Sequence, residues 1–81
     1  MIYPAQIRAA RALIDVSQAQ LAKRAGVGLG TVKRVEGSTD TLRVTVDVLL
    51  RIQRALEAEG VVFVDQDPKQ GPGVRLVKPI K

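Results

Sequence analysis

The feature that most constrains the fold is a short capped helix that runs into closely spaced glycines. Ser17 is a good N-cap residue, and Gln20 three positions later completes a capping box. Val16 and Leu21 fit the hydrophobic staple that often accompanies such a cap. Gly26 is well placed to end the helix in a left-handed conformation. The helix is then only about 8 residues long, so packing must stabilise it rather than intrinsic propensity.

The glycines at 26, 28 and 30 allow two interpretations, a phosphate cradle or a corner between two helices. A dinucleotide-binding fingerprint needs a strand before its glycines, whereas a capped helix precedes these. The spacing here is G-x-G-x-G, which matches neither G-x-G-x-x-G nor the phosphate-loop pattern. We therefore favour the corner.

A second short helix over residues 29–36 would complete a helix-turn-helix unit. Val32 and Val35 recur at helical spacing and are expected to face inward. Ala22 is small, so the second helix can cross close to the first. The residues expected on the exposed face of the second helix are Leu29, Gly30, Lys33 and Arg34.

The stretch "LIDVSQAQLAKRAGVGLGTVKRVEG" resembles the phage repressor/Cro-type, or xenobiotic-response-element type, helix-turn-helix family. The resemblance extends from about residue 5 to residue 59. The matching features are Val16-Ser17-Gln18, Leu21-Ala22, Ala25-Gly26-Val27 and the run from Val32 to Gly37. It implies a cytoplasmic, sequence-specific transcription regulator, a repressor that binds a short palindromic operator as a homodimer. The second motif helix would lie in the major groove of double-stranded DNA.

The resemblance also implies roles for single residues. Base reading falls to Leu29, Gly30 and Arg34, although the family commonly has polar side chains at the first two positions. Phosphate contacts fall to Gln18, Ser38, Thr39, Thr41 and Arg43. To these we add Ser17, Thr31 and Lys33, the last because its flexible ammonium is a point charge. Gln18 is also a candidate to support the reading helix.

Arg11 and Glu36 match positions that the family often pairs as a buried ion pair. The alternative is two solvated charges. We favour pairing because each residue stands beside apolar residues that are expected to face inward.

The predicted fold is mainly α, a four-helix repressor-like helix-turn-helix domain followed by a short C-terminal antiparallel β-hairpin. The domain covers residues 1–60, and the hairpin with its tail covers residues 61–81. Two further helices are expected, over residues 3–15 and 45–59, with Thr45 as the N-cap of the second. Their apolar positions are Ile7, Ala10, Leu13 and Ile14 in the first and Val46, Leu49, Ile52 and Leu56 in the second.

The strands are expected at residues 61–64 and 74–77, which are rich in β-branched side chains. Two strands of this length are not stable alone, so they must pack on the helices, pair with a second copy, or both. We predict a dimer contact, and the alternative is a hairpin that only covers the core of its own chain. The contact residues would be Val61, Val62, Phe63, Val64, Val74 and Leu76.

Composition excludes several classes of function. The 81 residues include no cysteine and no histidine, so disulfides, the usual zinc sites and histidine-dependent catalysis are unavailable. We expect no enzyme activity, no cofactor and no metal. Tyr3 and Phe63 are the only aromatic residues, which argues against a platform for stacking single-stranded bases.

The net charge of +5 favours an anionic partner, and nucleic acid is the first candidate. No acidic residue occurs from Val16 to Val35, whereas four basic ones do. No segment resembles a membrane span or a signal peptide, so we expect a cytoplasmic protein without a membrane partner. An alternative function is an antitoxin or adaptor that binds a partner protein and autoregulates its own promoter.

Overall fold

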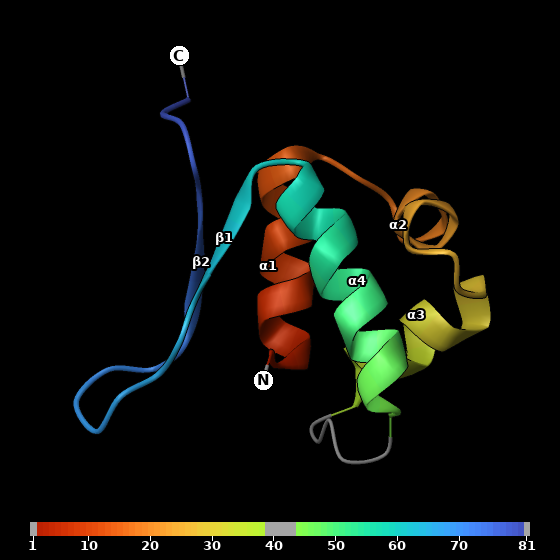
Figure 1. The fold of residues 1–81 in the computed structure, drawn as a ribbon, viewed down its shortest axis with the longest axis horizontal. Coiled ribbons are helices and arrows are strands. Elements are labelled where there is room, and N and C mark those ends of the chain that lie inside the picture. Colours follow the sequence, from red (N-terminus) through yellow and green to blue (C-terminus); the bar gives the residue numbers. More distant parts are fainter. Residues whose placement is uncertain (1, 39–43, 81) are drawn as a thin grey trace.

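The computed structural model describes residues 2–38 and 44–80. Within this part of the chain, four helices are followed by a two-stranded antiparallel sheet (Figure 1). The elements are α1 (Pro4–Ile14), α2 (Gln18–Ala25), α3 (Leu29–Gly37), α4 (Val46–Ala58), β1 (Val61–Val64) and β2 (Gly73–Leu76). This architecture confirms the predicted fold class, although β2 begins and ends one residue earlier than expected.

Local sequence signals explain the boundaries of α2. The Ser17 hydroxyl accepts a hydrogen bond from the backbone N–H of Gln20 at 3.0 Å, and the Gln20 side chain accepts one from Ser17 N–H at 2.9 Å. The helix ends at Gly26, whose φ of +70° strains any residue with a Cβ. The expected capping box and glycine stop are both present. Residues 26–28 form the turn between α2 and α3.

The core lies where the four helices meet. Its largest fully buried side chains are Ile7, Leu21, Val32, Val35, Ile52 and Leu56. α1 and α4 lie side by side in the middle, with α2 and α3 to one side and the hairpin to the other (Figure 1). The two sides of the molecule are therefore formed by different elements.

The apolar stripe of α4 begins later than the sequence suggested. Thr45 caps the helix as expected, accepting a hydrogen bond from Val48 N–H at 3.2 Å. Val46, however, is 59% exposed. It is the first residue of the helix and projects beyond the edge of the core, whereas Val48 and Ala55 pack against the core beside the buried positions. Inclusion of Val46 in the stripe was wrong.

The hairpin covers one face of the helices. Val61 pairs with Leu76, and Phe63 pairs with Val74. These side chains pack against the core, while Val64 is exposed. Four of the six residues assigned to a dimer contact are therefore in contact with their own chain. Dimerisation stays a prediction, and any contact through the hairpin would have to use its outer face or its edges.

One buried amide, Gln6 of α1, attaches the hairpin to the helices. Its Nε2 donates hydrogen bonds to the carbonyl oxygens of Val64 at 3.2 Å and Gly73 at 2.9 Å. Its Oε1 accepts from Tyr3 N–H at 2.8 Å. Because Val64 and Gly73 face each other at one end of the sheet, this single side chain fixes both strands to α1.

None of the helices in the described stretches combines the length and the apolar character that crossing a membrane requires.

Candidate nucleic-acid interface

The interface is built on α3, which has one buried face and one exposed face. Val32 and Val35 are fully buried and hold the helix on the core. Leu29, Gly30, Lys33 and Arg34 are exposed, as the helical spacing predicted. Leu29 is a large apolar side chain that is 40% exposed. The exposed face is thus one apolar residue, one glycine and two cations.

The orientation of α3 is set by Glu36, which is one of two buried polar residues in the described chain. Its carboxylate receives two hydrogen bonds from the Arg11 guanidinium, at 2.6 Å from Nε and 2.7 Å from Nη2. Gln18 donates a third, from Nε2 at 3.1 Å. The ion pair that the resemblance implied is therefore present and bidentate, and Gln18 links the start of α2 to α3.

The hydrogen bonds to Glu36 raise the pKa of Arg11 above its ordinary value, against the opposing effect of burial. Arg11 therefore carries its positive charge at neutral pH. A permanent cation beside a carboxylate with 3% exposure neutralises the only acidic residue between positions 16 and 38. The outer face of α3 is left with an uncompensated positive charge.

Arg8 is a further contact that the sequence did not indicate. Its Nη1 donates to the backbone carbonyl of Glu36, near the C-terminal end of α3. Arg11 also donates from Nη1 to the carbonyl of Val16, ahead of α2, at 3.1 Å. The spacing of Arg8 and Arg11, three residues apart on one face of α1, was the available signal. Together they fix both motif helices to α1.

The N-terminal end of α3 has no side-chain cap. Gly28 occupies the cap position, and its carbonyl accepts from Thr31 N–H at 3.1 Å. The amides of the first turn, at Leu29 and Gly30, can therefore donate to an acceptor outside the chain. Thr31 is half-buried beside the cap, and Ser17 and Gln18 stand at the corresponding end of α2.

Neither backbone conformation nor packing within the described residues requires a glycine at position 30. Its φ is not positive, and a Cβ added there would have no atom within 4 Å. Gly26 differs, because its positive φ requires glycine. A glycine in the first turn of an exposed helix costs about 1 kcal/mol relative to alanine, and neither backbone conformation nor packing in the described chain offsets that cost.

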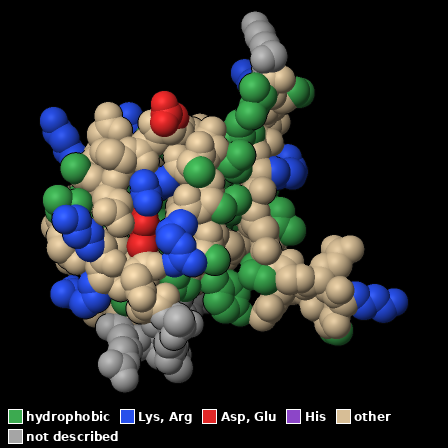
Figure 2. Space-filling view, turned by 180° about the vertical axis from the view of Figure 1, so that it is seen from behind, with side chains coloured by type: hydrophobic (Ala, Val, Ile, Leu, Met, Phe, Trp, Pro, Cys, Tyr) green, Lys and Arg blue, Asp and Glu red, His purple; other side chains and the backbone are tan. Residues whose placement is uncertain are grey.

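Some cations on the helical side are paired, and others, such as Lys23 and Arg54, form no ion pair within the described residues. Arg24 pairs with Glu59 at 2.9 Å, and Arg51 pairs with Asp47 at 2.9 Å. Lys33 and Arg34 form no ion pair within residues 2–38 and 44–80. Figure 2 shows Lys and Arg side chains spread over the helical side, whereas apolar side chains follow the hairpin.

The remaining phosphate candidates follow α3. Ser38 is half-buried directly after the helix. Thr39, Thr41 and Arg43 lie outside the described residues. No group of three or more His, Cys, Asp or Glu side chains that could hold a metal ion occurs in the described parts of the chain.

Comparison with known proteins identifies no family for this chain. No protein-family model matches the chain, and no curated protein matches it. The assignment of function therefore depends on the arrangement of α2 and α3.

Proposed function

We propose that the protein is a sequence-specific regulator that binds double-stranded DNA by placing α3 in the major groove. The observation that carries this proposal is the outer face of α3. Lys33 and Arg34 are exposed and have no ion pair in the described chain, while the neighbouring Glu36 is buried and neutralised. A major groove admits one helix, and its walls are phosphates that attract such a face.

Each exposed group of α3 has a matching group on DNA. The Arg34 guanidinium can donate two hydrogen bonds to the O6 and N7 atoms of guanine. Leu29 can pack on a thymine methyl group, which is the apolar feature of the major groove. Lys33 suits a phosphate, because its flexible ammonium is a point charge. The uncapped amides at the start of α3 are further phosphate donors.

The glycine at position 30 supports a close approach. The open space around it belongs to the surface that would face DNA. Without a side chain there, the backbone of α3 can come nearer to the base edges, and Arg34 then reaches deeper. Specificity would depend on Arg34, on Leu29 and on DNA shape rather than on several bidentate contacts.

A repressor that acts on a short palindrome would bind as a homodimer, because twofold symmetry in the protein matches inverted half-sites. We retain this as part of the proposal. Light scattering measures the mass of the free protein. A second measurement on the DNA complex gives the number of copies for each site.

Salt-dependent DNA binding tests the proposal without knowledge of the operator. Fluorescence anisotropy with a random-sequence duplex should show an affinity that falls steeply as salt rises. Lys33→Ala should reduce the magnitude of the slope of log K against log salt by about 1. Lys69→Ala, an equal charge change in the exposed hairpin loop, is the matched control and should leave the slope unchanged. Equal effects of the two variants would overturn the assignment of α3.

The second candidate function, an antitoxin or adaptor that binds a protein, is favoured by one observation on the opposite side of the molecule. That observation is the outer edge of β2, which faces away from β1 and pairs with no third strand in the described residues.

A further inference from the structure

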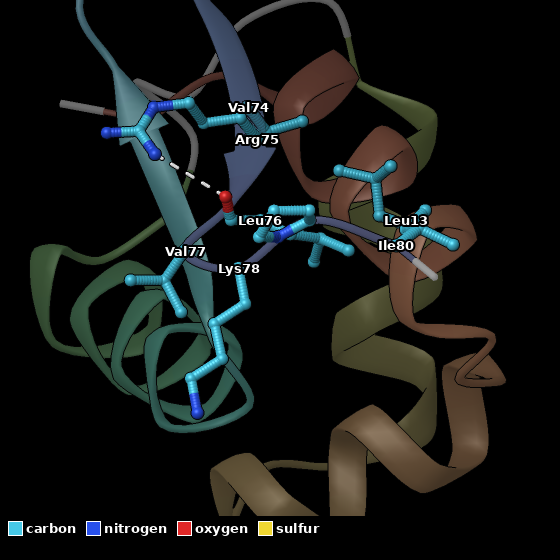
Figure 3. A pocket seen from close by; sticks show the side chains of 8 residues that line it. Leu13, Val74, Arg75, Leu76, Val77, Lys78 and Ile80 are labelled. Atoms are coloured by element: carbon cyan, nitrogen blue, oxygen red, sulfur yellow. Dashed lines mark hydrogen bonds between the residues drawn. The ribbon is translucent and has the colours of Figure 1, made fainter.

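An open groove of about 500 Å³ runs between the last turn of α1 and β2 with the residues that follow it. Leu13 forms one wall, and residues 74–80 form the other (Figure 3). Leu13 and Ile80 both line the groove, and Val74 points toward α1 (Figure 3). Leu13, Val77 and Ile80 are all exposed, Ile80 by 75%. The groove is therefore lined by apolar side chains that remain exposed to solvent.

The edge of β2 beside this groove faces away from β1. Val77 N–H points inward, donating to the Gly60 carbonyl at 2.8 Å. Because directions alternate along a strand, the N–H and C=O groups of Val74 and Leu76 point away from β1. The Leu76 carbonyl accepts a long hydrogen bond, 3.4 Å, from Arg75 Nη1 (Figure 3). Within residues 2–38 and 44–80, no other strand pairs with this edge.

The charges along the groove have one sign. Arg75 and Lys78 are the ionisable residues among those that line it, and both are exposed. Glu59 lines the neighbouring surface beyond the same tail, but it pairs with Arg24 at 2.9 Å. An occupant that carries carboxylates next to apolar side chains is therefore complementary to this groove.

We propose that an extended segment of a partner protein, in which apolar and acidic residues alternate, adds to the edge of β2 as a third strand. Its backbone pairs with the outward N–H and C=O groups of Val74 and Leu76. Its apolar side chains cover Leu13 and Ile80, and its carboxylates meet Arg75 and Lys78. Pairing then replaces the long bond to Arg75, which frees that guanidinium for a carboxylate.

A second copy of this chain fits the same edge less well, because pairing two identical edges brings Arg75 and Lys78 of one copy to those of the other, and the residues that line the groove supply no carboxylate. In the register centred on Arg75, the two arginines lie directly opposite each other, where like charges are destabilising. β2, which forms one wall of the groove, lies on the opposite side of α1 and α4 from α3 (Figure 1). Partner binding here therefore leaves the proposed DNA surface open, and the inference does not rest on DNA binding.

The test uses the full chain and a synthetic heptapeptide in which valine and glutamate alternate. In a nuclear magnetic resonance titration, the peptide should shift the backbone amide signals of Val74 and Leu76 in a saturable way. A peptide with lysine in place of glutamate should bind at least tenfold more weakly. The double variant R75E/K78E should reverse that preference, whereas Lys69→Glu in the hairpin loop should change neither affinity by more than about twofold.

Circular dichroism confirms that each variant is folded before titration. The proposal is overturned if the acidic peptide leaves the two amides unmoved. Equal binding of both peptides, or an equal effect of Lys69→Glu, also overturns it. A doubled mass in light scattering, with the amides of Val74 and Leu76 protected only at high protein concentration, would assign the edge to a second copy instead.

Discussion

α3 and the hairpin are attached to opposite sides of the same helical pair, and each is held by one buried polar residue. Glu36 holds α3 through charged and amide side chains that come from α1 and α2. Gln6 holds the hairpin through two backbone carbonyls, and its Oε1 accepts a hydrogen bond from the Tyr3 N–H at the start of α1. They are the buried polar residues of the described chain. α1 contributes to both attachments, with Arg8 and Arg11 on one side and Gln6 on the other.

The difference shows what each attachment can specify. A bidentate ion pair fixes the distance and the angle between two elements, because both guanidinium donors must meet both carboxylate oxygens. A neutral amide bonded to backbone groups holds a sheet end in place whatever the strand side chains are. The orientation of α3 is therefore set by charged side chains, whereas the hairpin is held by one amide and by apolar packing. The outer edge of β2 pairs with no third strand in the described residues.

Removing the Arg11 guanidinium should have the largest effect on stability. Arg11→Met keeps the apolar stem but leaves the buried Glu36 carboxylate without its ion partner. The free energy of unfolding should fall by about 3 kcal/mol, measured by urea denaturation.

The double variant Arg11→Met/Glu36→Leu is the control for this prediction. It removes the uncompensated charge and should recover most of the lost stability. A loss below about 1 kcal/mol in the single variant would mean that the pair behaves as a solvated one, and the charged attachment would then have no special role.

Removing the side-chain amide of Gln6 should have a smaller effect on stability, and the effect should be confined to the hairpin. Gln6→Leu leaves the carbonyls of Val64 and Gly73 with fewer donors and the Tyr3 N–H without its acceptor. We expect a loss of about 2 kcal/mol in the free energy of unfolding. Hydrogen exchange should become faster in β1 and β2 and stay unchanged in α3.

Gln66→Leu is the matched control, because Gln66 is exposed and donates only to the Tyr3 hydroxyl, at 2.7 Å. It should change stability by less than about 0.5 kcal/mol. Faster exchange in α3 as well as in the hairpin would show that the two attachments are not independent.

The smallest effect is expected at Gly30. Gly30→Ala places a methyl group in open space and should stabilise the fold by up to about 1 kcal/mol in thermal unfolding. DNA affinity should fall in the same variant, because the methyl group holds the α3 backbone away from the base edges. An unchanged affinity would show that close approach is not the reason for the glycine. Gly26→Ala should instead destabilise, since its φ is +70°.

Local signals predicted the helices well, because their causes lie within a few residues. The capping box of α2 and the glycine stop after it involve neighbours in sequence, and both are present. The same is true of Thr45 at the start of α4. The prediction for Val46 was wrong because the hydrophobic period indicates which face of a helix is apolar, but it does not indicate where along the helix the core begins.

The contacts that hold the two sides could not be read from local patterns. Gln6 bonds to residues 58 and 67 positions away, and no period or cap in the sequence marks such a partner. Arg8 reaches the end of α3 from α1, and its spacing from Arg11 indicated the face of α1 involved but not the partner. The Arg11–Glu36 pair was expected through the family resemblance, and the residues alone left a solvated alternative open. The exposed face of α3 followed directly from helical spacing.

The most direct test of the central claim is selection of bound sequences from a random library of double-stranded DNA. The intact protein should enrich one motif, arranged as two inverted half-sites. Arg34→Ala should relax one base pair in each half-site, at a cost of about 1–3 kcal/mol, while the matched control Arg54→Ala on the exposed face of α4 should return the original motif. Enrichment of no motif, or an unchanged motif with Arg34→Ala, would contradict base reading by α3.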